Sequence, residues 1–134
     1  MILVDTNVLI DVISKDSSWA VRSIRQLTIS AGSERGPLAI NDIVYAELSA
    51  KFRSEALLRE TIETMDLRLE RLPETALFPA GQAFGTYRAS GGPRTSLIAD
   101  FLIGAHAAVA QVPILTRDVR RYRNYCPNVE LISP

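Results

Sequence analysis

The segment Met1-Ile-Leu-Val-Asp-Thr-Asn-Val-Leu-Ile-Asp-Val-Ile13 decides how the rest of the chain is interpreted. Its first four residues form an apolar run that predicts a buried strand, and Thr6 or Asn7 can cap the helix that follows. Asp5 stands between the two elements. In a parallel sheet that alternates with helices, ligands bind beyond the carboxyl ends of the strands. Asp5 therefore lies where a functional carboxylate is expected.

The composition describes one soluble domain over residues 1–134, with 47% apolar and 22% charged residues. A chain of this length can bury one sizeable core. Cys126 has no second cysteine to pair with, and the start lacks a secretory signal, so we expect a cytoplasmic protein. The longest apolar segment, Leu97–Gln111, carries Asp100 and is too short to span a membrane. With 15 basic and 15 acidic residues, net charge gives no sign of nucleic-acid binding.

Apolar strand candidates alternate with helix candidates along the chain. This order predicts the α/β class, with a mostly parallel sheet covered by helices on both faces, because parallel neighbours need crossover connections. Asn41 and Ser54 are expected helix N-caps and Gly32 a C-cap. The expected strands are 1–4, 37–40, 67–73, 112–116 and 129–132. The expected helices are 8–13, 42–52, 54–65, 74–89 and 97–111, together with one that is capped by Ser17–Ser18 and ends at Gly32. Pro79 is expected to disturb the first turns of the helix 74–89. The basic segment 120–123 is assigned no element.

Asp100 is the only formal charge in the apolar helix Leu97–Gln111. A carboxylate in such a helix is costly unless it is paired, hydrogen-bonded or bound to a metal. Asp118 follows a strand candidate as Asp5 does, and Glu47 lies among apolar residues of the helix after the second strand. If these four carboxylates converge, their repulsion is severe, and a divalent cation resolves it. Oxygen ligands without His or Cys favour Mg²⁺ or Mn²⁺, and so phosphate chemistry.

Each acid also has a purely structural interpretation. Asp5 can cap a helix, Asp118 can stabilise a turn, Glu47 can be an ordinary solvated residue, and Asp100 can pair with a buried arginine. Only the combination of the four favours a shared site.

The combination resembles the PIN-domain ribonucleases, and among them the VapC-like toxins of bacterial type II toxin–antitoxin modules. Four segments carry the resemblance, which spans nearly the whole chain in order and spacing. They are Met1–Ile13, Asn41-Asp-Ile-Val-Tyr-Ala-Glu-Leu48, Ala99-Asp-Phe-Leu-Ile-Gly-Ala-His-Ala107 and Ile114-Leu-Thr-Arg-Asp118.

The resemblance implies a five-stranded parallel sheet and an endoribonuclease site dependent on Mg²⁺ or Mn²⁺. The family's four acidic positions, which hold the metal and act in catalysis, correspond to Asp5, Glu47, Asp100 and Asp118. The resemblance further implies that Asn7 and Thr116 contact these acids without binding the metal themselves. Hydrolysis of an RNA phosphodiester by metal-activated water fits both the residues and the resemblance. A homodimer and a small VapB-like antitoxin partner are also implied. His106 departs from the commonest pattern, and we expect it to be packed or at a dimer face.

The remaining charges suit an RNA substrate, since removing four site acids leaves 11 acidic against 15 basic residues, 13 of them Arg. Guanidinium groups can grip phosphate in a bidentate manner. The candidate RNA contacts are Arg94, Arg117, Arg120, Arg121 and Arg123, and for each of them ordinary solubilising charge is the alternative.

Two other functions stay open at this stage. A phosphomonoester hydrolase of the haloacid-dehalogenase type also begins with a strand-end aspartate, but it needs a second one at the position of Asn7. A non-catalytic PIN-type or α/β interaction module would use the acids to hold a structural cation or a partner's arginine.

Overall fold

The computed structural model describes residues 1–15, 18–92 and 98–134, which form an α/β fold around a five-stranded parallel sheet. The strands run in the order β3-β2-β1-β4-β5, so the first strand is central. Their bounds are β1 Ile2–Val4, β2 Leu38–Asn41, β3 Arg68–Glu70, β4 Ile114–Leu115 and β5 Leu131–Ile132. The predicted fold class is confirmed, and every pairing in the sheet is parallel.

The register of the sheet brings three sequence-distant segments to one edge. Leu3 of β1 lies opposite Ala39 of β2 on one side and Ile114 of β4 on the other. Because all three strands run in the same direction, their carboxyl ends meet at this edge, where Asp5 and the residues after Asn41 and Leu115 follow. All three residues of β1 are at most 1% exposed, so the strand that positions Asp5 at this edge is held in the core.

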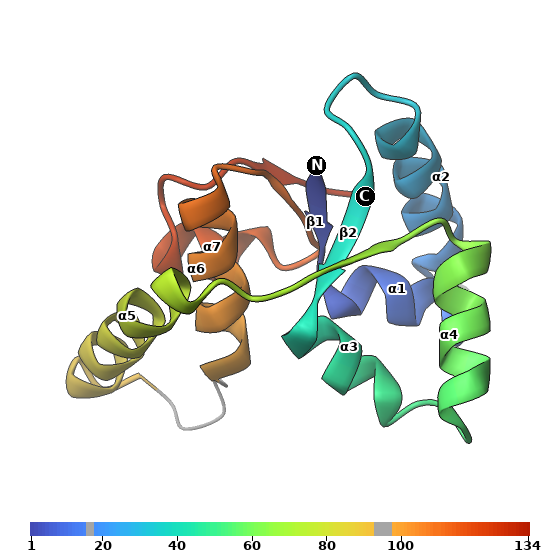
Figure 1. The fold of residues 1–134 in the computed structure, drawn as a ribbon. Helices are drawn as coiled ribbons and strands as arrows, with labels where there is room; N and C mark the ends of the chain where they lie inside the picture. The colour runs from blue at the N-terminus through green and yellow to red at the C-terminus, as the bar shows by residue number, and fades with distance from the viewer. Residues whose placement is uncertain (16–17, 93–97) are drawn as a thin grey trace.

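Helices cover both faces of the sheet (Figure 1). Helices α1, α2 and α4 lie on one side of β1 and β2, and α5, α6 and α7 lie on the other. The bounds are α1 Thr6–Ile13, α2 Ala20–Ala31, α3 Asp42–Ser49, α4 Glu55–Thr64, the 3-10 turn η1 Glu74–Ala76, α5 Leu77–Ala89, α6 Ile98–Ala110 and α7 Val119–Tyr125.

The apolar core has two parts. The larger contains the apolar residues of β1, β2 and β4 together with side chains such as Val8, Leu48 and Ile103 from the surrounding helices. The smaller lies between η1, α5 and α6, where Phe101 packs on Ala76 and Ala80. A ring cluster of Phe84, Tyr87, Phe101 and Tyr125 extends this smaller core toward α7.

Several element boundaries differ from the predicted ones. The helix predicted over 42–52 ends at Ser49, and the strands predicted over 67–73, 112–116 and 129–132 shorten to β3, β4 and β5. The helix predicted from residue 74 begins as the 3-10 turn η1, and Pro79 then occupies the first turn of α5, where its missing N–H costs no hydrogen bond. The basic segment that was given no element forms α7.

The predicted caps have mixed outcomes. The Asn41 side chain accepts hydrogen bonds from the backbone N–H groups of Ile43 and Val44, and Ser54 accepts one from Leu57. Gly32 is the C-cap of α2. Capping of α1 by Thr6 or Asn7 is wrong, because Asp5 occupies the N-cap position and its carboxylate makes no capping hydrogen bond. That carboxylate faces other partners, described below.

Further predictions fall on residues that the structure leaves aside. They are Ser17 of the proposed Ser17–Ser18 cap, residues 93–96 of the predicted loop and Leu97 at the start of the predicted helix. The Ser18 half of that cap is wrong, because Trp19 occupies the N-cap position of α2. Among the residues that the structure does describe, no helix combines the length and the apolar character needed to cross a bilayer. The cytoplasmic location stays a prediction.

Candidate functional site

The four predicted acids line one cleft at the carboxyl edge of the sheet. The cleft has a volume of about 460 Å³, and its walls include Asp5, Glu47, Asp100 and Asp118. Each acid comes from a different place in the fold: the end of β1, helix α3, helix α6 and the N-cap of α7. The structure thus brings together side chains that are up to 113 positions apart in the sequence. Their roles as ligands or catalysts stay predictions.

Asp5 is the most buried of these acids, at 5% exposure. The pKa of its carboxyl is raised from 3.8 to about 6. Burial is the main cause, the hydrogen bond from Thr116 opposes it, and the negative charges of Asp100 and Glu47 add to the rise. Thr116 Oγ1 donates to Asp5 Oδ2 at 2.7 Å, and Asn7 Nδ2 donates to the same oxygen at 2.8 Å. One carboxylate oxygen is therefore held fixed by two donors.

Asn7 and Thr116 also hold the loop that carries the last acid. The Arg117 backbone N–H donates to Asn7 Oδ1 at 3.1 Å, and the Asp118 backbone N–H donates to Thr116 Oγ1 at 3.0 Å. Asn7 Nδ2 lies 3.2 Å from Thr116 Oγ1, which joins the two residues directly. These contacts join Asn7 and Thr116 to Asp5 and to the Asp118 loop. The supporting role that the resemblance implies for the two residues stays a prediction.

Arg121 bridges two of the acids. Its Nη1 lies 2.8 Å from Asp100 Oδ2, and its Nε lies 3.0 Å from Asp118 Oδ2. The side chain of Asp100 is only 17% exposed, so its charge needs such a partner. Burial raises the pKa of Asp100, and the guanidinium of Arg121 opposes that rise. A cation therefore already neutralises part of the cleft, and it is supplied by the chain itself.

Glu47 projects into the cleft from α3 and accepts a hydrogen bond from the hydroxyl of Thr6. Thr6 follows Asp5 directly, so this contact links the first turn of α1 to α3 across the cleft. Through this hydrogen bond Glu47 is held near Asp5, although the two acids are 42 positions apart in the sequence.

The carboxylate oxygens of the cleft are of the type that binds a hard divalent cation, but they lie too far apart in this structure to hold one ion together. All four acids are carboxylates, the ligands that Mg²⁺ and Mn²⁺ prefer. In the part of the chain that the structure describes, no three acid, imidazole or thiol groups lie close enough to hold one ion. Asp100 and Asp118 are turned to Arg121 and Glu47 to Thr6. Binding an ion would require Arg121 to release its partners.

Comparison with known proteins bears on what this cleft is. The sequence model of the PIN domain family matches residues 2–126. The chain belongs to the PIN domain family. No curated protein sequence matches it.

Solved structures share the fold of this PIN domain. A chain of VapBC2 from Rickettsia felis, bound to a DNA fragment from its promoter, superposes with a TM-score of 0.73 at 22% identity, over 99% of this chain and 98% of that one. VapBC-1 from nontypeable Haemophilus influenzae gives 0.73 at 19% identity, over 99% and 98%. DNA-bound VapBC from Salmonella typhimurium gives 0.72 at 18% identity, over 98% and 96%. The expected resemblance to VapC-like PIN domains is confirmed for family and fold.

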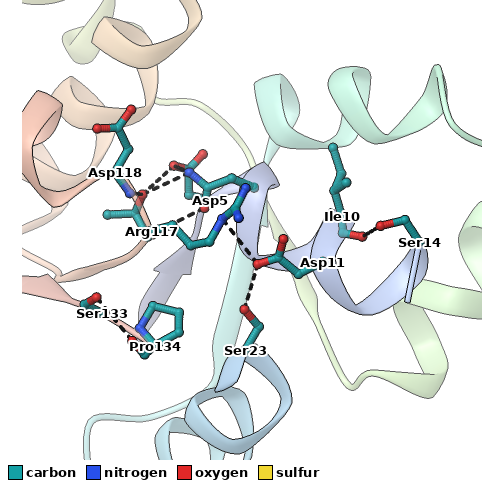
Figure 2. A network of polar contacts seen from close by, with 11 residues as sticks. Asp5, Ile10, Asp11, Ser14, Ser23, Arg117, Asp118, Ser133 and Pro134 are labelled. Carbon is teal, nitrogen blue, oxygen red and sulfur yellow. Dashed lines mark hydrogen bonds and ion pairs between the residues drawn. The ribbon is translucent and has the colours of Figure 1, made fainter. Parts of the chain in front are cut away.

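Arg117, a predicted RNA contact, is not among the residues that line the cleft of the PIN domain, and Figure 2 shows its side chain reaching toward Asp11. Its Nε lies 3.3 Å from Oδ2 of Asp11, which is 2% exposed, and Ser23 Oγ donates to the same oxygen at 2.8 Å. The guanidinium also lies over the ring of Trp19, 5.0 Å from its centroid. These contacts tie the loop before Asp118 to α1 and α2, and an RNA contact by Arg117 stays a prediction.

The other predicted positions are placed as follows. Arg94 lies outside the described residues. Arg120 and Arg123 are exposed on α7. His106 is buried at 3% exposure, its Nδ1 accepts from Asn41 Nδ2 at 3.3 Å, and burial lowers its pKa. Of the two expectations for this histidine, packing in the interior is the one that the structure has.

Sequence reasoning missed three residues at or behind the site. Asp11 is an isolated charge among Val8, Leu9 and Val12, which is the same signal that identified Asp100. Lys51 lines the cleft from the end of α3. Tyr122 also lines it, at 1% exposure, and its hydroxyl has no hydrogen-bond partner among the described residues. No pattern in the sequence distinguishes Lys51 or Tyr122, because their positions depend on how α3 and α7 pack.

Proposed function

We propose that this PIN domain is an endoribonuclease that depends on Mg²⁺ or Mn²⁺ and acts as the toxin of a toxin–antitoxin pair. One observation carries the proposal: four carboxylates from four separate elements line a single cleft at the carboxyl edge of the sheet. Such a concentration of negative charge, with Asp5 almost fully buried, is unfavourable unless a cation occupies the cleft. The VapBC neighbours of the same fold support the choice of a toxin.

The residues of the cleft have distinct parts in this proposal. Asp5 and Asp100 would hold the ion, with Glu47 and Asp118 completing its ligands or orienting water. The bound ion supplies activation of water and neutralisation of charge on the phosphate and the leaving oxygen. Asn7 and Thr116 keep Asp5 in one orientation through their two hydrogen bonds. Arg121, once released by its acids, is placed to bind a phosphate oxygen.

The test is incubation of the purified protein with structured RNAs in Mg²⁺, in Mn²⁺ and in chelator. We expect cleavage with either ion and none in chelator. Asp100→Asn should lower the rate at least about 100-fold, since oriented charge in such sites contributes factors of this order. Asp66→Asn is the matched control, because Asp66 is exposed and adopts a positive φ that Asn tolerates.

Equal rates for Asp100→Asn and the unchanged protein would contradict the assignment of the site. Cleavage that persists in chelator would contradict the dependence on a metal. Loss of activity in Asp66→Asn as well would show that the assay reports folding or total charge rather than the cleft.

We further propose a VapB-like antitoxin partner and a homodimer. Arg121 already places a guanidinium between Asp100 and Asp118, so the cleft has the shape and charge to accept an arginine from a partner. Co-expression with the small protein encoded by the neighbouring gene should give a stable complex and block cleavage. An Asp118→Asn variant should bind that partner less tightly, because one of the two acids that grip an arginine is lost.

A non-catalytic role is the second candidate, and the pairing of Arg121 with two of the acids is the observation that favours it. Calorimetric titration with Mg²⁺ beside the RNA assay separates the two: binding without cleavage of any RNA supports the interaction module. The phosphomonoester hydrolase is disfavoured, because position 7 is an amide whose Nδ2 donates to Asp5 and cannot act as an acid or base.

A further inference from the structure

A second pocket adjoins the acidic cleft and has a different chemical character. It has a volume of about 810 Å³ and is lined by residues of α5, α6 and α7. Asp118 and Arg121 line both the pocket and the cleft, so the two spaces adjoin at these residues. In Figure 1 the three helices lie together on one side of the sheet. A molecule that occupies the cleft can therefore extend into the pocket.

Aromatic rings form one wall of this pocket. Phe101 and Tyr125 are stacked, with ring centroids 4.2 Å apart and planes 22° apart. Tyr87 packs its edge against Tyr125 at 5.2 Å and is tilted against Phe101 at 5.6 Å. The three rings hold one another in place, and Tyr87 and Tyr125 are only half-buried. Rigid, partly exposed rings of this kind are the surfaces on which nucleic-acid bases stack.

Charged and hydrogen-bonding groups complete the lining, among them the carboxylate of Asp118, which is paired with Arg121. Arg120 and Arg121 are exposed at the α7 side, where a nucleic-acid backbone would meet them. Thr86 and Asn124 present a hydroxyl and an amide, which can pair with the edge of a base. Such a lining, a mostly apolar wall with a few polar groups, is typical of sites for small planar ligands.

We propose that this pocket binds a nucleobase of the RNA next to the phosphodiester that lies in the acidic cleft. The proposal rests on the proposed function and adds a specificity site to it. A phosphate alone would gain no contact from the rings of Tyr87 and Tyr125, which Phe101 supports from the interior. An apolar peptide or a second copy of the chain would gain none from two exposed arginines beside them. A nucleotide matches all three features, since its base, its edge and its phosphate meet rings, polar groups and guanidinium in turn.

The test uses adenosine as the probe and ribose as its control, both with the metal-free full chain. Omitting metal and phosphate separates base binding from catalysis. Adenosine should shift the NMR resonances of the Tyr87 and Tyr125 rings in a saturable manner, and ribose should not. Thr86→Trp fills the pocket with an indole and should weaken adenosine binding at least tenfold. Gln82→Trp adds the same indole at an exposed position of α5 outside the pocket and should leave binding unchanged.

The outcomes divide cleanly. Saturable shifts that Thr86→Trp removes and Gln82→Trp keeps support the base pocket, even if the RNA assay shows no cleavage and the proposed function fails. No shift with adenosine, or equal shifts with ribose, overturns the base pocket while leaving RNA cleavage intact. If Thr86→Trp lowers the oligomeric mass in sedimentation and adenosine gives no shift, the pocket is an interface between copies of the chain, and the proposal is overturned.

Discussion

At the scale of single residues, Asp5 is a buried carboxyl whose surroundings disfavour its ionised form. Two donors hold its Oδ2, yet the loss of hydration outweighs them, and the pKa of the carboxyl rises to about 6. A raised carboxyl pKa means that the ionised group destabilises the fold at any pH above that value. The burial of Asp5 therefore lowers the stability of the protein whenever this carboxyl is ionised.

Replacing Asp5 should stabilise the metal-free protein. Asp5→Asn removes the charge, and each pH unit between 3.8 and about 6 corresponds to about 1.4 kcal/mol, so the gain in unfolding free energy should reach at most about 3 kcal/mol above pH 6. The gain should shrink as the pH falls from 6 toward 4, because the native carboxyl then takes up its proton. Urea unfolding in chelator between pH 4 and 8 measures it. A destabilised Asp5→Asn at every pH would contradict the argument.

Tyr122 is a second buried polar residue, and its hydroxyl has no hydrogen-bond partner in the part of the chain that the structure describes. Burial raises the pKa of this hydroxyl well above the ordinary value. Leaving such a group unsatisfied costs about 1–3 kcal/mol. Tyr122→Phe should therefore raise the free energy of unfolding by about 1 kcal/mol in urea.

Tyr45→Phe is the control for Tyr122→Phe. The Tyr45 hydroxyl is bound to Glu55 Oε1 at 3.3 Å near the surface, so its removal should change stability by less than about 0.5 kcal/mol. If Tyr122→Phe destabilises the protein instead, its hydroxyl has a partner that these contacts do not include.

At the scale of elements, the close crossing of α6 and α7 depends on one glycine. A Cβ built at Gly104 would lie 2.2 Å from Sγ of Cys126, just after α7, and 3.7 Å from Cδ1 of Tyr122. Alanine normally stabilises a helix interior over glycine by about 0.5–1 kcal/mol. At Gly104 that gain is overridden, because the added methyl group overlaps Sγ of Cys126 and forces it away from α6.

Gly104→Ala should therefore destabilise the protein by about 1–3 kcal/mol, as overpacking does. Gly85→Ala in α5 is the matched control, because a Cβ there meets no atom within 4 Å, and it should be neutral or stabilising. Adding Cys126→Ala to Gly104→Ala should recover part of the loss by removing the sulfur. Equal effects of Gly104→Ala and Gly85→Ala in thermal unfolding would show that α6 and α7 do not pack as described.

The elements also show where sequence reasoning succeeds and where it stops. The apolar runs around Leu3 and Ile114 and the caps Asn41 and Ser54 predict most strands and helices, because each depends on local chemistry. The sequence does not predict helix α7, because four of its seven residues are Arg or Asn. Its apolar residues Val119, Tyr122 and Tyr125 are three positions apart, but a segment this short gives only a weak helical pattern. It forms because Asp118 caps it, accepting from the Arg121 N–H at 3.2 Å, and because Tyr122 is buried.

The same limit applies to the cleft. Asp5 and Asp100 stand out in the sequence as isolated charges at apolar positions, whereas Arg117 was chosen only for its charge. Its burial against Asp11 and Trp19 follows from how α1, α2 and the Asp118 loop meet, which no local pattern records.

At the scale of the whole molecule, the strand order is what turns scattered acids into one site. With β1 central between β2 and β4, Asp5 lies between the elements that carry Glu47 and Asp118, and α6 brings Asp100 over them. The formal net charge of the chain is zero, so the total charge does not reveal the repulsion between the carboxylates of the cleft. A cation that enters this cleft relieves the repulsion only in the folded state, because unfolding disperses the acids.

Added Mg²⁺ or Mn²⁺ should therefore raise the melting temperature of the protein. At an ion concentration 100 times the dissociation constant, linkage adds about 2.7 kcal/mol to the free energy of unfolding, a rise of roughly 10 °C for a domain of this size. Scanning calorimetry in chelator and in increasing ion measures it, with NaCl at matched ionic strength as the control. Asp5→Asn should lose most of the rise, and Asp66→Asn should keep it. An equal rise in NaCl, or in Asp5→Asn, would mean that general screening of charge stabilises the fold and that no ion occupies the cleft.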